Sequence, residues 1–204
     1  MQPPCETSCS EDVPAVFGYG DANADVHVIG DHPGRHGGRT TGIPFTESDA
    51  GAALQSVLQA VGLLADPGEE PRLRNCFSSY LHACCPPADD DPSAAAYADL
   101  ERFFDAELRA IAAHVLVPVG ERATAHVLDT FTARRSDECD IESLHATEVR
   151  GSGWLVFPLS DPATWTTRDR EQAVEALAAL LDRDYRQTTD LGRFLATGDA
   201  YLVR

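Results

Sequence analysis

Short apolar runs alternate with longer amphipathic stretches along this chain. Four runs have the length and the β-branched or aromatic content of strands, at residues 24–30, 76–84, 114–120 and 154–160. Apolar residues recur at helical spacing in four other segments, 48–64, 91–114, 121–131 and 167–185. Pro92 stands near the start of the second helical segment, and Thr167 is expected to be the N-cap of the last one.

This alternation predicts βαβ crossovers and therefore an α/β fold, a three-layer α/β/α sandwich around a four-stranded, mostly parallel central sheet. Ligands bind such sheets beyond the carboxyl ends of the strands. We therefore expect the loops after Gly30, His82, Gly120 and Leu159 to lie together. We also expect one monomeric domain over residues 1–204, with its core at about 12–183 and a C-terminal extension at 184–204.

The charge balance is strongly acidic. The 204 residues carry a formal net charge of -17, and every basic residue is Arg, with no Lys. This combination is typical of haloarchaeal proteins, whose acidic surfaces stay hydrated in concentrated salt, although it also fits an acidic surface without any functional message. The sequence shows neither a membrane span nor a signal peptide, which predicts a cytoplasmic protein. In that reducing compartment, six Cys indicate metal ligands or buried thiols before disulfides.

A glycine-rich loop follows the first predicted strand, in the stretch VIGDHPGRHGGRTTGIPFT at residues 28–46. Its glycine spacing matches neither the dinucleotide motif G-x-G-x-x-G nor the phosphate loop G-x-x-x-x-G-K-[ST], which disfavours a nucleotide cofactor. Pro33 and Gly34 are typical of a turn, and Phe45 offers an aromatic face. The loop therefore has the character of a pocket floor.

Four segments, in order, resemble one known family. FGYGDANADVHVIGDHPG with GIPF, the helix around LQSVLQAVGL, the CCPP segment, and LHATEVRGSGWLVFPLSDPATW are similar to the uracil-DNA glycosylase superfamily, closest to the iron–sulfur enzymes of family four. The resemblance covers about residues 5–181. It implies a hydrolase of base excision repair that acts on DNA damage. Such an enzyme flips a nucleotide out of the DNA and hydrolyses the bond between deoxyribose and uracil or a related deaminated base.

The resemblance also implies roles for residues at the predicted loops. Asp31 takes the place of the family's motif Glu and would position water or stabilise the sugar cation, unless it only caps a turn. Phe45 would stack on the base, unless it is ordinary core. The implied set comprises catalytic Asp31, Asp161 and His32; base-binding Phe45, Tyr80, Gly30, Pro33 and Gly34; and DNA-binding Arg35, Arg39, Trp165 and Arg168.

Two positions depart from the family pattern. Tyr80 stands where the family has an Asn that reads uracil, and a hydroxyl cannot present the paired donor and acceptor of an amide. Asp161 replaces the family's His, and a carboxylate near a developing anion opposes the reaction. His32, His36 or His82 would then supply the missing positive group, unless these histidines are structural.

The cysteines form the third departure. The family binds a 4Fe-4S cluster through four thiolates. Here Cys5, Cys9, Cys84 and Cys85 are the candidate ligands, with Cys76 a less favoured fourth, while the helix position that holds a Cys in the family holds Phe. A 4Fe-4S cluster, zinc and no metal all remain open, and Cys139 has no assignment.

Three functions are compatible with these features. The first is a DNA glycosylase, and the second is a catalytically weakened protein that binds nucleic acid or a damaged base through the same pocket. The third is a redox or metal site without base chemistry. A cavity the size of a pyrimidine that Asp31, Phe45, Tyr80 and Asp161 all face would support catalysis or recognition of a base. A Tyr80 side chain that fills this cavity would count against the enzyme.

Overall fold

The computed structural model describes residue 5 and residues 9–86, 91–138 and 140–186. Cys139 and residues 187–204 of the expected C-terminal extension lie outside this part of the chain. The strands are β1 Tyr19–Gly20, β2 Val26–Gly30, β3 Leu64–Asp66, β4 Arg72–Leu73, β5 Cys76–Tyr80, β6 Val115–Pro118, β7 Val149–Arg150 and β8 Leu155–Val156. The α-helices are α1 Pro33–His36, α2 Asp49–Ala60, α3 Ala94–Ile111, α4 Glu121–Phe131 and α5 Thr167–Leu181, and short 3-10 turns include η3 Pro162–Thr164.

The central sheet has six strands in the order β1-β5-β2-β6-β8-β7. The four predicted strands form its parallel centre, β5-β2-β6-β8, and β1 and β7 add an antiparallel strand at each edge. The predicted count of four strands is therefore too low. The two edge strands have only two residues each, which is too short for a period-two pattern to appear in the sequence.

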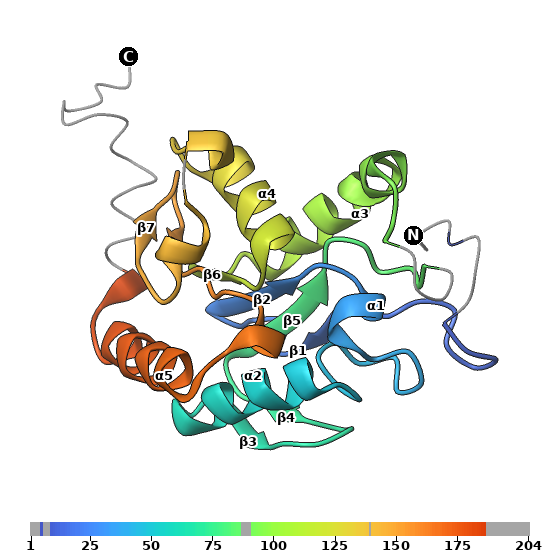
Figure 1. Ribbon diagram of the computed structural model, residues 1–204, viewed down its shortest axis with the longest axis horizontal. Helices are drawn as coiled ribbons and strands as arrows, with labels where there is room; N and C mark the ends of the chain where they lie inside the picture. The colour runs from blue at the N-terminus through green and yellow to red at the C-terminus, as the bar shows by residue number, and fades with distance from the viewer. Residues whose placement is uncertain (1–4, 6–8, 87–90, 139, 187–204) are drawn as a thin grey trace.

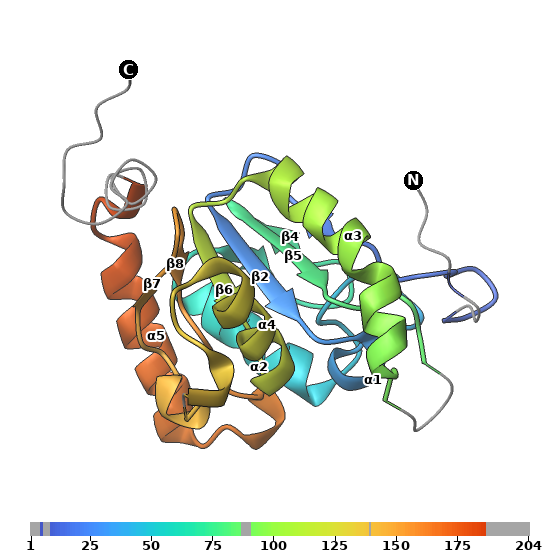
Figure 2. The same cartoon turned by 90° about the horizontal axis from the view of Figure 1, so that it is seen from above.

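Helices cover both faces of this sheet, so the predicted three-layer α/β/α architecture is confirmed. Figure 1 shows α3 and α4 on one side and α2 and α5 on the other, and Figure 2 shows the same arrangement from above. Neighbouring residues of β2 point to opposite faces of the sheet. Val28 packs in the core beneath α2 and α5, and Ile29 packs in the core beneath α3 and α4. Strands buried on both faces explain the nearly continuous apolar runs of the sequence.

Side-chain caps start α2, α3 and α5, whereas α4 begins after Gly120 without one. Ser48 caps α2 and Ser93 caps α3, each by accepting a backbone N–H from the first turn. The N-cap of α5 is Thr166 and not the predicted Thr167, because Thr166 forms a reciprocal capping box with Asp169. In the described part of the chain, no helix is long and apolar enough to cross a membrane.

Candidate active site

The four loops that were predicted to meet do meet at one end of the sheet. The backbone N–H of His82 donates to the carbonyl of Asp31 at 3.0 Å, which joins the loops after β5 and β2. The backbone N–H of Gly120 donates to the carbonyl of Leu159 at 2.8 Å, which joins the loops after β6 and β8. Strand order reverses at β2, since β5 lies on one side of it and β6 on the other. The loops thus surround the switch point where α/β sheets bind ligands.

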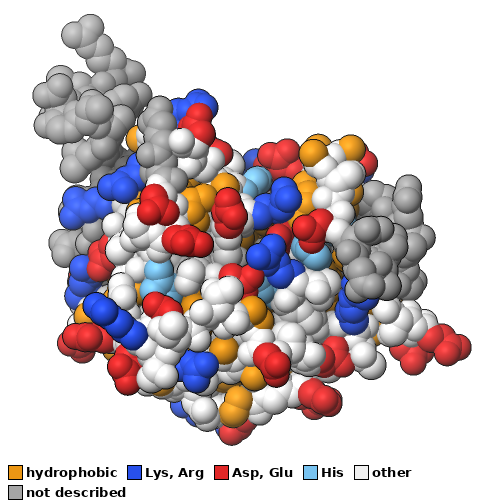
Figure 3. Space-filling view, viewed as in Figure 1, with side chains coloured by type: hydrophobic (Ala, Val, Ile, Leu, Met, Phe, Trp, Pro, Cys, Tyr) orange, Lys and Arg blue, Asp and Glu red, His pale blue; other side chains and the backbone are white. Residues whose placement is uncertain are grey.

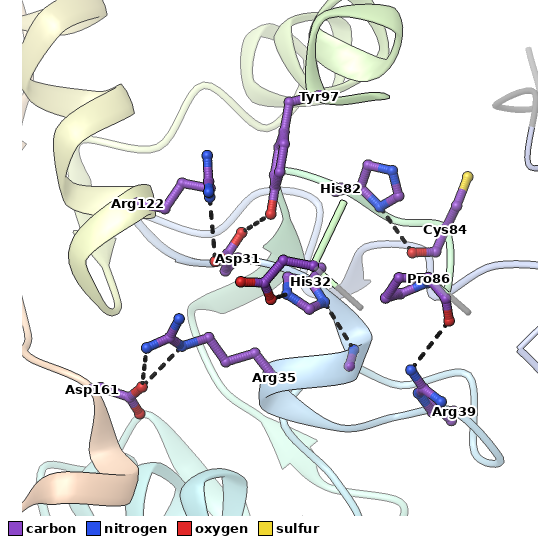
Figure 4. A network of polar contacts seen from close by, with 12 residues as sticks. Asp31, His32, Arg35, Arg39, His82, Cys84, Pro86, Tyr97, Arg122 and Asp161 are labelled. Atoms are coloured by element: carbon purple, nitrogen blue, oxygen red, sulfur yellow. Dashed lines mark hydrogen bonds and ion pairs between the residues drawn. The ribbon is translucent and has the colours of Figure 1, made fainter. Parts of the chain in front are cut away.

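Asp31 is the first residue after β2, and its carboxylate is buried. One oxygen, Oδ1, accepts a hydrogen bond from the hydroxyl of Tyr97 on α3. The other oxygen, Oδ2, lies 3.7 Å from Nε of Arg122 on α4. Figure 4 shows both side chains reaching the carboxylate from the helices above it. The site therefore contains a buried carboxylate that is held at both oxygens.

Three histidines belong to the loops at this end of the sheet, and burial lowers the pKa of each. His32 is the N-cap of α1: its Nδ1 accepts the N–H of Gly34 at 3.1 Å, and its Nε2 lies 3.2 Å from Asp91. His82 bonds through Nδ1 to the carbonyl of Cys84 at 2.9 Å. His36 is fully buried, its pKa falls to about 4, and neither ring nitrogen has a partner among the described residues. The rings are therefore neutral at pH 7.

Arg35 and Asp161 form an ion pair between α1 and the turn after β8. Nε and one terminal nitrogen of Arg35 each lie 2.9 Å from Oδ2 of Asp161, while Oδ1 of Asp161 accepts the N–H of Ala163. Partial burial acts to raise the pKa of Asp161, but the Ala163 bond and the Arg35 guanidinium outweigh it and lower that pKa. Asp161 is thus an ionised carboxylate whose charge is balanced by Arg35 (Figure 4).

Gly30, Phe45 and Tyr80 form a packed cluster under the loop. Gly30 is in register with Tyr80 across the parallel β2–β5 pair. The Tyr80 hydroxyl accepts the N–H of Phe45 at 2.7 Å and donates to the carbonyl of Gly37 at 3.1 Å, and the two rings meet edge to face at 5.2 Å. Phe45 is only 3% exposed. A base can stack on its ring only after neighbouring side chains move.

The remaining predicted residues spread from the loop toward the surface. Pro33 is the first residue of α1, with Gly34 exposed beside it. Arg39 donates to the carbonyl of Pro86 at 3.3 Å, which braces the loop against the segment after β5.

Trp165 donates through its indole to Ser160, and Arg168 is exposed in the first turn of α5. Figure 3 shows basic, acidic and histidine side chains interspersed on the face viewed there.

The four candidate cluster ligands come together, but as disulfides. Cys5 is bonded to Cys84 and Cys9 to Cys85. A four-iron cluster requires four thiolates, so sulfurs that are bonded to one another do not fit it. Within the described residues, no group of three or more His, Cys, Asp or Glu side chains is arranged to hold a metal ion. This differs from the expectation of metal ligands, and the less favoured candidate Cys76 is a buried free thiol.

Sequence reasoning missed two residues that contact Asp31. Tyr97 lies at helical spacing with the apolar residues of the predicted segment 91–114, and nothing in this pattern reveals that its hydroxyl reaches a carboxylate. Arg122 follows Gly120 by two positions, so its place after the third predicted strand was the signal that could have found it.

Comparison with known proteins agrees with this geometry. The family model of the uracil DNA glycosylase superfamily matches residues 17–182, which include every strand of the central sheet. The chain belongs to the uracil DNA glycosylase superfamily. The resemblance stated from the sequence is thereby confirmed at the level of the superfamily.

Two similar members of the superfamily carry the name Type-5 uracil-DNA glycosylase. The protein from Thermus thermophilus is 32% identical over 126 residues, which are 59% of this chain and 57% of that protein. The protein from Pyrobaculum aerophilum is 28% identical over 173 residues, which are 81% of this chain and 73% of that protein. The match thus spans little more than half of the Thermus protein's length.

Proposed function

We propose that this chain is a DNA glycosylase that hydrolyses the N-glycosidic bond of uracil, or of a related deaminated base, in DNA. The observation that carries the proposal is the buried carboxylate of Asp31 at the carboxyl end of β2, contacted by Tyr97 and Arg122 at the switch point of the sheet. Superfamily membership and the two relatives named Type-5 uracil-DNA glycosylase support it.

The proposed reaction breaks the bond between the base nitrogen and C1′ of deoxyribose, and the electron pair leaves with the base. The oxygen of a water molecule bonds to C1′. Asp31 orients this water and accepts its proton, and its negative charge stabilises the positive charge that develops on the sugar. A carboxylate offers about four lone-pair sites, so the contacts with Tyr97 and Arg122 leave it acceptor capacity for the water.

The charges of the side chains proposed to surround the departing base anion balance one another. An isolated Asp161 carboxylate would repel the base anion, but Arg35 lies 2.9 Å from it and balances its negative charge. The neutral ring of His32 carries its N–H on Nε2, where Asp91 lies 3.2 Å away, so a base that displaces Asp91 can receive this hydrogen bond without a full positive charge on the ring. In this proposal, hydrogen-bond donation and not a cation stabilises the leaving group.

DNA is the proposed partner, in spite of the net charge of -17. Arg39 and Arg168 supply local cations for phosphates on the side of the predicted loops, beside Arg35 with its Asp161 partner, and Trp165 supplies an aromatic surface. In concentrated salt, counterion release adds little affinity, so base flipping and stacking would contribute most of it.

The test is an oligonucleotide assay. Purified protein is incubated with single-stranded and double-stranded DNA that contains one uracil, hypoxanthine or xanthine, in low and in high potassium chloride. Alkali then cleaves abasic products. We expect abasic product from at least one base, and its loss in the isosteric variant Asp31→Asn. Absence of product from every substrate in both salts would refute the proposal.

A second candidate function is binding of damaged or single-stranded nucleic acid without turnover. The observation that favours it is the packing of Phe45 beneath Tyr80, because the buried ring cannot receive a base in this conformation. This candidate predicts oligonucleotide binding that Asp31→Asn leaves unchanged, with no abasic product. Failure to bind any oligonucleotide in low or high salt would exclude it.

A further inference from the structure

Charged and titratable residues from several elements interact electrostatically with Asp31, but only some of them contact its carboxylate oxygens. His32 and Arg35 approach from the loop and α1, and His82 approaches from the loop after β5. Each of these three is bonded elsewhere: His32 to Gly34 and Asp91, Arg35 to Asp161, and His82 to the carbonyl of Cys84. Among the described residues, Tyr97 from α3 and Arg122 from α4 contact the Asp31 carboxylate itself.

Tyr97 and Arg122 also contact each other. The guanidinium carbon of Arg122 lies 4.4 Å from the centre of the Tyr97 ring, within the range of a cation–π contact. This stacking orients Arg122 along the ring and directs its Nε toward Oδ2 of Asp31. Burial, together with the hydrogen bond to Asp31, raises the pKa of the Tyr97 hydroxyl, so this hydroxyl remains a donor at any working pH.

A hydrogen bond at one oxygen and an ion pair at the other restrain the plane of a carboxylate. Asp31 follows the last residue of β2, where its side chain can rotate unless other groups hold it. The Tyr97 hydroxyl anchors Oδ1 and Arg122 lies against Oδ2, so rotation about the last side-chain torsion breaks both contacts. The remaining lone pairs then point in one set of directions, which is the condition for holding an attacking water.

We propose that Tyr97 and Arg122 are positioning residues for hydrolysis, acting through Asp31 and not on the DNA. This inference rests on the proposed glycosylase function. It assigns a role to residues of the two helices that cover one face of the sheet, outside the loop motifs that carry the family resemblance. It also predicts that their loss lowers the rate of bond cleavage and leaves DNA binding unchanged.

The experiment measures two quantities in each variant. One is the single-turnover cleavage rate with enzyme in excess over a uracil-containing oligonucleotide. The other is the dissociation constant for an oligonucleotide with the non-hydrolysable 2′-fluorinated uracil nucleotide. Tyr97→Phe and Arg122→Gln are expected to lower the rate, by up to about 100-fold, with the dissociation constant within about twofold of the wild type. Arg122→Lys is expected to recover part of the rate, since it restores the charge but not the planar stacking.

Matched controls separate positioning from general damage. Arg102 stacks on the neighbouring Phe103 ring at 4.8 Å on the same helix as Tyr97, so Arg102→Gln removes a similar cation–π contact away from Asp31. Tyr19→Phe removes a hydroxyl from an edge strand. Both controls are expected to retain the wild-type rate, and thermal melting checks that every variant is folded.

A double-mutant cycle supplies the decisive readout. If Tyr97 acts through Asp31, Tyr97→Phe lowers the rate in the wild-type background and has no further effect on the residual single-turnover rate of Asp31→Ala, which offers the Tyr97 hydroxyl no side-chain acceptor. Equal rate losses in both backgrounds, wild-type rates in Tyr97→Phe and Arg122→Gln, or weaker DNA binding that accounts for the loss would each overturn the inference while the glycosylase function stands. A wild-type protein without abasic product overturns the proposed function and this role with it.

Discussion

Gly30→Ala tests the packing beneath the candidate active site. A Cβ at this position would lie 2.7 Å from Cζ of Phe45 and 2.7 Å from Cε1 of Tyr80. Carbon atoms in contact normally stay about 3.5–4.0 Å apart, so both rings must retreat by close to 1 Å. The φ of Gly30 lies outside the left-handed region, and the penalty is therefore steric and not a matter of backbone strain.

Neither ring can retreat easily. The Tyr80 hydroxyl is bonded to the N–H of Phe45 and to the carbonyl of Gly37, and Phe45 is 3% exposed. Overpacking of a well-packed core costs about 1–3 kcal/mol, and this site belongs at the upper end of that range. For a chain of this size, about 3 kcal/mol corresponds to a fall in melting temperature of roughly 6–12 °C.

Urea unfolding and thermal melting measure the effect. Gly62→Ala is the control, because its Cβ would have no neighbour within 4 Å and only the positive φ of +83° opposes it. That variant is expected to lose about 1 kcal/mol. Adding Phe45→Leu to Gly30→Ala should relieve one clash, so the double variant should lose less than the sum of the single losses. A Gly30→Ala protein within about 0.5 kcal/mol of the wild type, or strict additivity, would refute the steric argument.

Three further predictions concern stability. Tyr80→Phe leaves the N–H of Phe45 buried without its acceptor and should lower the free energy of unfolding by about 1–3 kcal/mol in urea; an unchanged midpoint would contradict it. The Cys5–Cys84 disulfide joins residues 79 positions apart. In a variant that lacks the second disulfide through Cys9→Ser and Cys85→Ser, reduction should therefore lower that free energy by about 4.5 kcal/mol in the chain-entropy account; an equal midpoint with and without reductant, or iron in the purified wild-type protein, would count against it. Burial lowers the pKa of His27 to about 3, so its neutral form stabilises the fold above pH 6.5 and this stabilisation is lost as the pH falls toward 3. Between pH 7 and 4.5 the free energy of unfolding should fall by about 2–3 kcal/mol for this reason. His27→Val should remove that part of the pH dependence in urea unfolding. An equal pH dependence in the variant and the wild type would refute it.

The sequence pattern was sufficient for the parallel centre of the sheet and for the long helices. Strands such as β2 and β6 are buried on both faces, so their apolar runs are nearly unbroken and easy to recognise. The two-residue edge strands β1 and β7 escaped prediction, because hydrogen bonds to a neighbouring strand define them and their own residues do not. The N-cap of α5 was misplaced by one residue, since two adjacent Thr both suit a cap and only the bond to Asp169 selects Thr166.

For the candidate site, the sequence by itself determined which loops meet at one end of the sheet and which superfamily the chain belongs to. Chain order and strand direction bring Asp31 and the loop after β6 to the same sheet edge, whatever the side chains do. Only the tertiary structure decided which groups hold Asp31, that Arg35 balances Asp161, and that the Cys5 and Cys9 sulfurs pair with those of Cys84 and Cys85. These contacts join residues far apart in the chain, and their partners depend on distances of a few ångströms between packed elements, which no local pattern of hydrophobic and polar residues encodes.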